Sequence, residues 1–186
     1  PAEEAVNFNS DVISILNTEK IVQTAKNHRS DKVYDVSVIS NGDPLEIFTE
    51  KDGEVIFRKY SPVGEIGGIA ADCAEALNKA AGISVIICDR DTVVASSGLP
   101  GREYNERSVT DEFRTVCGAR GGYSHTEKKL YPVAGCGRFV SCASPIVCDG
   151  DVTGVVAVLS GDDGKTDRAD ARLASAAAGF IASQLN

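Results

Sequence analysis

The chain has 186 residues, of which 42% are hydrophobic and 25% charged, and its net charge at pH 7 is −8. This composition is typical of a globular protein, and the length suffices for one full core plus a smaller appended unit. No apolar run approaches the roughly 20 residues that span a bilayer, and no basic segment followed by an apolar one opens the chain. The sequence therefore predicts a cytoplasmic protein with no membrane segment.

The charge distribution disfavours nucleic acid as a default partner. Residues 1–60 contain seven Lys/Arg against eleven Asp/Glu, and residues 61–186 contain twelve against sixteen, so neither part is basic. Neutralisation of phosphates supplies most of the non-specific affinity for nucleic acid, so DNA binding would require the few cations to converge. The six cysteines form no C-x-x-C pair, which predicts reduced thiols, no metal site and no cofactor.

The stretch GDPLEIFTEKDGEVIFRKYSP, residues 42–62, predicts a β-hairpin followed directly by a helix. Apolar and polar residues alternate from Leu45, Asp52-Gly53 supplies a turn dipeptide, and a second β-branched and aromatic run ends at Tyr60. Ser61 suits an N-cap and Pro62 the first helical position, so we expect a helix that runs to Gly82. Its predicted apolar stripe consists of Ile66, Ile69, Ala70, Cys73, Leu77 and Ala80, and a bend is expected at Gly64, Gly67 and Gly68.

Four further strands and two helices are expected after this helix. Residues 83–88 and 92–95 predict two paired strands, and Ser108 with Asp111 resembles a capping box, which predicts a helix over about 109–116 that stops at Gly118. Residues 139–147 and 152–160 predict two strands joined by a turn at 148–151; the second does not alternate at 155–159 and should be central and covered on both faces. A last helix, capped by Thr166, has the predicted stripe Leu173, Ala176, Ala177, Phe180 and Ile181. The order of these elements predicts an α+β fold, an antiparallel sheet with helices on one face.

Several segments also resemble a known family. The runs GDPLEIF, DGEVI and KYSP resemble the second half of an AbrB-type DNA-binding domain, as it occurs in sporulation transcription regulators with a C-terminal GAF domain. The runs SVIICDRDTVVASSG and SPIVCDGDVTGVVAVLS and the Ala-rich last helix resemble that GAF domain, so the likeness covers residues 42–186. Residues 1–41 lack the basic strand and the arginine-rich helix of the AbrB type; in their place, Ile13, Leu16, Ile21 and Ala25 indicate an amphipathic helix and residues 33–39 a strand.

The resemblance implies a GAF-like antiparallel sheet at 61–186, preceded by a hairpin unit at 1–60 that resembles half of a swapped-hairpin domain. It implies a sporulation-type transcription regulator, not an enzyme, in which the GAF domain senses a small effector and controls the hairpin unit. A lone hairpin cannot bury its apolar side chains, so we expect a homodimer held by the hairpin and the Ser61 helix, with higher assembly left open. The only local basic cluster of the N-terminal unit gives the candidate DNA contacts Lys26, Arg29 and Lys32, although the end of a solvated helix explains the same residues.

The effector, if it lies under the irregular middle of the chain, would contact aromatic side chains and an arginine that binds an anionic or carbonyl group. The candidate lining residues are Tyr104, Phe113, Arg114, Tyr123, Arg138, Phe139 and Ser141. His125 beside Ser124 lacks the G-x-S-x-G pattern of a hydrolase nucleophile. Two alternatives stay open: a stand-alone small-molecule or protein-binding module, and a thiol-dependent reductase of the free methionine sulfoxide type, for which Arg138 lies two residues from Cys136.

Overall fold

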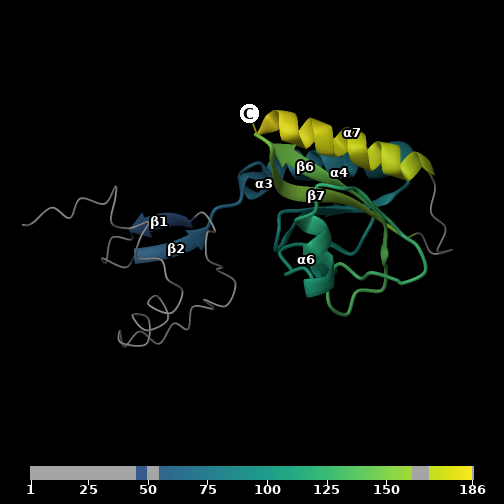
Figure 1. Ribbon diagram of the computed structural model, residues 1–186, viewed down its shortest axis with the longest axis horizontal. Coiled ribbons are helices and arrows are strands. Elements are labelled where there is room, and N and C mark those ends of the chain that lie inside the picture. The colour runs from purple at the N-terminus through teal and green to yellow at the C-terminus, as the bar shows by residue number, and fades with distance from the viewer. Residues whose placement is uncertain (1–44, 50–54, 161–167, 186) are drawn as a thin grey trace, which may run out of the picture. The chain divides into compact units, whose positions relative to one another are not determined.

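The computed structural model describes residues 45–49, 55–160 and 168–185 (Figure 1). Contacts divide the chain into two units, Pro1–Tyr60 and Ser61–Asn186, and each is described by itself. Within the described ranges, no helix is both long and apolar enough to cross a membrane. The helix and strand predicted within residues 1–41 lie outside the described residues, as does the predicted cap Thr166.

The first unit contains the expected hairpin. Strands β1 (Leu45–Thr49) and β2 (Val55–Lys59) pair in antiparallel register, with Ile47 opposite Phe57. Alternating and β-branched residues favour this extended pairing. The predicted turn dipeptide Asp52-Gly53 lies outside the described residues, but the pairing on both sides of it confirms the hairpin.

The helix predicted from Ser61 to Gly82 is present and is broken once. Ser61 Oγ accepts a hydrogen bond from the Gly64 amide at 3.0 Å and begins α3 (Pro62–Glu65), and α4 (Gly67–Ala81) follows after Ile66. Glycines at this junction lower the helix propensity, which explains why the expected bend falls here. Gly82 ends α4 in the left-handed conformation at φ 68°, where glycine is favoured.

The second unit is built on a five-stranded antiparallel sheet in the order β4-β3-β7-β6-β5. Its strands are β3 (Ser84–Cys88), β4 (Val93–Ser97), β5 (Tyr123–Ser124), β6 (Val140–Cys148) and β7 (Asp151–Leu159). β7 lies between β3 and β6 and is buried from Gly154 to Leu159, which confirms the predicted central strand. The turn between β6 and β7 has positive φ at Asp149 and Gly150, as a two-residue type I′ hairpin requires.

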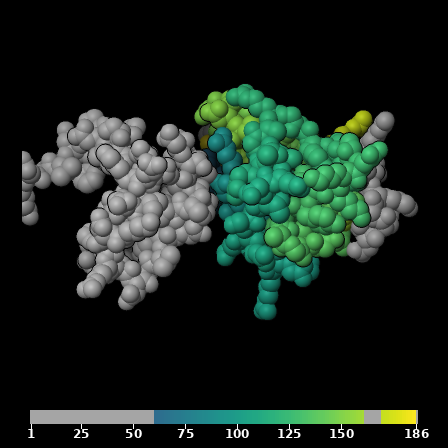
Figure 2. Space-filling view, turned by 60° about the horizontal axis from the view of Figure 1, so that its bottom comes forward, coloured from purple at the N-terminus to yellow at the C-terminus, as the bar shows by residue number. Residues whose placement is uncertain are grey.

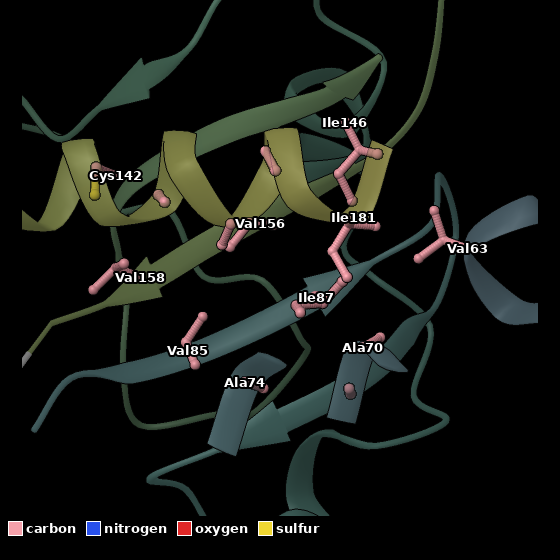
Figure 3. Close-up of a cluster of buried hydrophobic side chains, with 14 residues drawn as sticks. Val63, Ala70, Ala74, Val85, Ile87, Cys142, Ile146, Val156, Val158 and Ile181 are labelled. Carbon is pink, nitrogen blue, oxygen red and sulfur yellow. The ribbon is translucent and has the colours of Figure 1, made fainter. Parts of the chain in front are cut away.

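Two long helices cover one face of this sheet. α4 contacts β3 and β4, and α7 (Arg168–Gln184) contacts β6 and β7, so the two helices lie together on one layer (Figure 1). The core between the layers is aliphatic, and small helix side chains allow the helices to approach the sheet closely (Figure 3). It includes Val63, Ala70, Ala74, Val85, Ile87, Val156, Val158, Ala174, Ala177 and Ile181.

The opposite face is covered by the middle of the chain. The short helices α5 (Gly101–Tyr104) and α6 (Asp111–Cys117) and the irregular segments around them pack on the alternate side chains of the same strands. In the space-filling view, teal and green segments form much of the visible surface of this unit (Figure 2). The buried cluster on this face includes Ile86, Val93, Tyr104, Val109, Phe113, Val133, Val155 and Ala157.

Three details of the sequence prediction are wrong. α6 begins at Asp111 and its cap is Thr110, whose Oγ1 accepts from the Phe113 amide at 3.2 Å, so Ser108 is not the cap. On α7, Ala176 and Phe180 are exposed, and the buried residues are Ala174, Ala177, Ala178 and Ile181. Because alanines lie on several sides of α7, the apolar spacing fits more than one face and does not fix which face is buried. Ala80 of the predicted α4 stripe is exposed for a similar reason.

Candidate functional site

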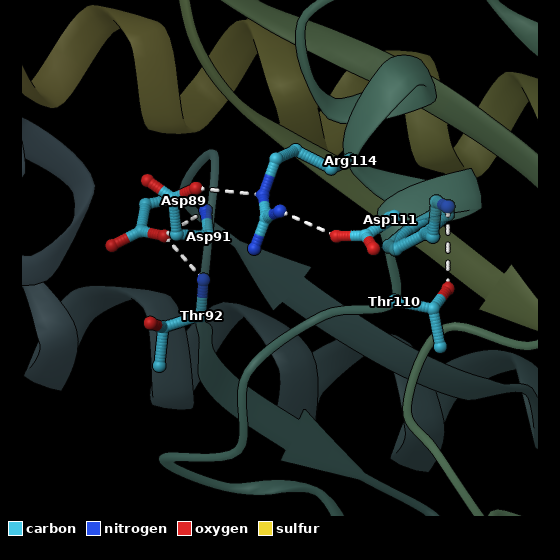
Figure 4. Close-up of polar contacts among 7 residues, drawn as sticks. Asp89, Asp91, Thr92, Thr110, Asp111 and Arg114 are labelled. Atoms are coloured by element: carbon cyan, nitrogen blue, oxygen red, sulfur yellow. Dashed lines mark hydrogen bonds and ion pairs between the residues drawn. The ribbon is translucent and has the colours of Figure 1, made fainter. Parts of the chain in front are cut away.

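The turn between β3 and β4 and the start of α6 form one polar network (Figure 4). Asp89 Oδ1 accepts hydrogen bonds from the amides of Asp91 and Thr92, at 2.7 and 2.6 Å, which fixes the turn. Asp91 Oδ1 then pairs with Arg114 Nε at 2.9 Å, and Arg114 Nη1 pairs with Asp111 Oδ1 at 2.7 Å. Arg114, a predicted ligand residue, therefore already binds two carboxylates and connects α6 to the β3–β4 turn.

Arg138, the second predicted arginine, also contacts the protein itself. Its Nη1 donates to Ser84 Oγ at 3.0 Å and to the Ser160 carbonyl oxygen at 3.1 Å. Ser84 begins β3 and Ser160 follows β7, so the guanidinium joins neighbouring strands at one end of the sheet. A role for Arg138 in binding an effector stays a prediction.

Tyr104 and Phe113 are core residues in this structure. Phe113 is fully buried and Tyr104 is 1% exposed, and both belong to the cluster between the sheet and the middle segment. Burial, and then the neighbouring Cys136 thiol, raises the pKa of Tyr104 to about 12. The phenol is therefore neutral at physiological pH. Their predicted contact with a ligand stays a prediction, and it would require the core around them to open.

Ser141 and Phe139 converge with two residues that were not predicted, His125 and Lys129. The His125 amide donates to the Ser141 carbonyl oxygen at 2.8 Å, so His125 extends the pairing of β5 with β6. The rings of His125 and Phe139 have centroids 4.6 Å apart, and Lys129 Nζ lies 5.1 Å from the Phe139 centroid. We call these four residues the His125–Ser141 edge. Tyr123, another predicted residue, lies on β5 opposite Ala143, two positions before His125.

Among the described residues, His125 Nδ1 is buried without a hydrogen-bond partner, and Ser141 Oγ has only the weak contact with the neighbouring Cys142 thiol. Buried polar side chains are paired in the great majority of cases, so these two atoms, on residues joined by a backbone hydrogen bond, distinguish this edge from the networks of Arg114 and Arg138. The edge can offer two hydrogen-bonding groups and one nearby ammonium to a small molecule. No group of three or more metal-ligating side chains is present within the described residues.

Comparison with known proteins identifies the family. Residues 65–186 match the family model described as "Stage V sporulation protein T C-terminal, transcription factor". Stage V sporulation protein T of Bacillus subtilis (strain 168) is 37% identical over 150 residues, which are 79% of this chain and 84% of that protein. The chain belongs to this transcription factor family. A GAF domain/HD domain protein from Geobacter sulfurreducens aligns in structure with 69% of this chain and 98% of its own, at 19% identity and a TM-score of 0.47.

Membership of the stage V sporulation protein T family confirms the resemblance to sporulation regulators and argues against an enzyme. Three buried thiols agree with this assignment. Burial raises the pKa of Cys117 to about 12 and that of Cys142 to about 11, and burial likewise raises the pKa of Cys88 well above its usual value. These cysteines are therefore neutral thiols at pH 7, whereas a nucleophilic cysteine needs a lowered pKa.

The sequence contained a partial signal for the missed residues of this stage V sporulation protein T relative. His125 and Lys129 flank the polar residues Thr126, Glu127 and Lys128, but no spacing indicates that His125 would pair with Ser141. That pairing depends on the register of β5, a strand of two residues. The candidate DNA contacts Lys26, Arg29 and Lys32 lie outside the described residues, so their role stays a prediction.

Proposed function

We propose that this protein is a sporulation-type transcription regulator in which a GAF-like domain at 61–186 senses a small effector and controls an AbrB-like DNA-binding unit at 1–60. The observation that supports it most is the attachment of α3. Only Tyr60 and Ser61 separate β2 from α3, and Val63 of α3 is fully buried in the core of the second unit (Figure 3). A movement of that core would therefore reach the end of the hairpin through two residues.

The contact below α3 is unusually close. Gly154 of β7 lies against Val63 and the β3–β4 turn: a Cβ at Gly154 would overlap the Cys88 carbonyl oxygen and would lie 3.1 Å from Val63 Cγ2 and 3.2 Å from Asp89 Cα. Asp89 belongs to the turn that Arg114 joins to α6. A continuous chain of contacts thus runs from α6 to α3, and such contiguous packing is one way in which two sites are coupled.

The family assignment supports a DNA target, and the salt dependence of binding tests it. The full chain is mixed with random-sequence duplex DNA at about 50 and about 200 mM salt and followed by electrophoretic mobility shift. We expect a shift at micromolar protein that weakens steeply with salt. If Lys26, Arg29 and Lys32 contact phosphates, replacing all three by alanine lowers the slope of log affinity against log salt by about 2 to 3.

The matched control replaces three exposed cations of the second unit, Lys79, Arg102 and Arg120, by alanine and changes the net charge equally. It should leave the slope unchanged. Equal losses in the two triple variants would mean that the basic cluster makes no specific contact. No shift of the native chain at micromolar concentration would overturn the assignment of a DNA-binding regulator.

We further propose a homodimer, in which a second copy contributes to the hairpin unit and packs on α7. Leu173, Ala176 and Phe180 follow one another at spacings of three and four along α7, and Phe180 is 47% exposed. This spacing is that of an apolar seam between two helices. A shallow hollow beside it is lined by Ala169, Arg172, Leu173 and Ala176. Sedimentation equilibrium tests the dimer: a monomer mass at tens of micromolar would contradict it, and Phe180→Glu should weaken it.

A further inference from the structure

The two buried polar atoms of the His125–Ser141 edge are held in place by ordinary backbone pairing. Ser141 is 2% exposed; among the described residues its Oγ meets only the Cys142 thiol, a weak hydrogen-bonding group, and His125 Nδ1 has no partner. A buried polar group without a partner has lost its hydrogen bonds to water and has formed no others. An apolar side chain at either position would therefore make the folded state more stable. The presence of both groups on neighbouring strands indicates that a partner outside the protein pairs with them.

The segment 126–129 follows His125 and is attached to β6 at both ends. The His125 amide donates to Ser141 O and the Val140 amide donates to Leu130 O, each at 2.8 Å, so two consecutive residues of β6 hold both ends of the segment. Its four residues, Thr126, Glu127, Lys128 and Lys129, are all exposed. It reaches α6 through the ion pair of Lys128 Nζ with Glu112 Oε1 at 3.0 Å, whose side chains are 79% and 62% exposed. Exposed pairs of this kind are weak, so the segment can lift while its ends stay attached.

The chemistry of the edge favours a small carboxylate. The Ser141 hydroxyl and a protonated imidazole nitrogen of His125 can each donate one hydrogen bond, and a carboxylate presents two acceptor oxygens. Lys129, the cation nearest to the Phe139 ring, supplies the opposite charge, and the ring forms an apolar wall for the rest of the ligand. Arg114 and Arg138 bind protein groups instead.

We propose that the His125–Ser141 edge is the effector site of this protein and that it binds a free small carboxylate beneath the segment 126–129. This inference rests on the proposed effector-sensing function and names its site and ligand class. Binding would displace the exposed segment and release the Lys128–Glu112 pair, so α6, which Arg114 joins to the β3–β4 turn, would lose that contact.

The experiment uses the full chain and four free acids, acetate, propionate, succinate and benzoate, each with its uncharged amide as control. Thermal unfolding is measured with each compound at millimolar concentration. We expect at least one carboxylate to raise the unfolding temperature, its amide to leave it unchanged, and Ser141→Ala or His125→Phe to weaken its binding at least tenfold. Without ligand, both variants should unfold at the same or a higher temperature than the native chain, because each removes a buried polar group that lacks a strong hydrogen bond.

A second pair of variants is independent of the core. Lys129→Gln should weaken binding about tenfold, whereas Lys79→Gln, at an exposed position of α4, should leave the affinity for the carboxylate within a factor of two. A carboxylate shift that survives Ser141→Ala and His125→Phe would place the site elsewhere and overturn this inference while leaving effector sensing intact. Lower unfolding temperatures of both ligand-free variants would show a structural role and also overturn it, as would no response to any of the four acids. Absence of DNA binding by the native chain would instead count against the regulator itself, whatever the thermal shifts.

Discussion

The two faces of the second unit's sheet are covered in different ways. On the face of α4 and α7, the core is aliphatic and its helix side chains are mostly alanine, so regular helices pack directly on regular strands. On the other face, short helices and irregular segments cover the sheet, and ion pairs and hydrogen bonds of Arg114 and Asp89 position them. The buried polar atoms His125 Nδ1 and Ser141 Oγ lie within that middle part of the chain and the strand beside it.

This difference suggests different roles for the two faces. The α4/α7 face is suited to stabilising the fold, and the face covered by the middle of the chain is suited to changing conformation when a ligand binds. Close packing of aliphatic groups resists small displacements, because any shift opens a gap or a clash. Segments attached through exposed ion pairs and a few backbone bonds open at lower free energy, and elements that move on ligand binding are drawn from such regions. We therefore expect changes on the α4/α7 face to alter stability, and changes on the other face to alter the response to a ligand.

The largest expected effect compares two adjacent residues of β3. Ile86 and Ile87 are both fully buried, but Ile87 lies in the core under α4 and α7 and Ile86 lies in the core under the middle segment. Replacement by alanine should lower the free energy of unfolding by about 4 kcal/mol at Ile87 and by about 2 to 3 kcal/mol at Ile86, since the irregular cover can collapse further into the space. Urea unfolding of both variants measures the difference.

Equal losses at the two positions would show that the two faces are packed equally rigidly, and a larger loss at Ile86 would reverse the comparison. Because both residues have the same side chain and the same burial and neighbour each other on one strand, differences in strand propensity do not enter the result.

The second prediction concerns Gly154, which lies where α3 meets the sheet. An added Cβ would overlap the Cys88 carbonyl oxygen, which belongs to the backbone and cannot rotate away. Gly154→Ala should therefore lower the free energy of unfolding by about 1 to 3 kcal/mol. The control is Gly179→Ala on α7, where a Cβ meets nothing within 4 Å and helix propensity should raise the free energy of unfolding by up to about 1 kcal/mol. Chemical unfolding that gave both variants the same sign would contradict the close contact at α3.

The α4/α7 face could be predicted from the sequence more fully than the other face. Period-two and unbroken apolar runs located β3, β6 and β7, and Ser61, Pro62 and Gly82 marked both ends of the helical segment before β3. These signals depend only on neighbouring residues, so they predict the same elements however the rest of the chain folds. The side of α7 that is buried could not be predicted, because its alanines allow several faces to pack.

The candidate site shows more clearly what sequence patterns cannot predict. Phe139 and Ser141 were predicted and lie on the His125–Ser141 edge, whereas Tyr104 and Phe113 are core residues and both arginines bind the protein itself. Which aromatic residue is buried in the middle segment depends on how that segment folds across the sheet, and its spacing has no regular period. The pairing of His125 with Ser141 continues the register of β5 with β6, and a strand of only two residues leaves no pattern from which one sequence reveals that register.

The smallest expected effect concerns the two ion pairs that attach α6 and the segment 126–129, on the face of the sheet opposite α4 and α7. A double-mutant cycle with Arg114→Gln and Asp91→Asn should give a coupling free energy of about 0.5 to 1 kcal/mol, because the Asp91 side chain is only 13% exposed although that of Arg114 is 41% exposed. The same cycle with Lys128→Gln and Glu112→Gln should give about 0 to 0.3 kcal/mol, since both side chains are well exposed. Added salt should reduce the first coupling only in part and remove the second.

The relative size of these two coupling free energies decides which part of this face is fixed, α6 or the segment 126–129. A strong Arg114–Asp91 pair with a weak Lys128–Glu112 pair means that α6 stays fixed to the β3–β4 turn while the segment 126–129 lifts, so a displacement at the His125–Ser141 edge reaches α6 as the loss of its contact with Lys128. The reverse order, measured by urea unfolding at low salt, would make the segment 126–129 the fixed part and α6 the mobile one. Entry beneath the segment would then require another opening, and the route from this edge to α3 would lose its first step.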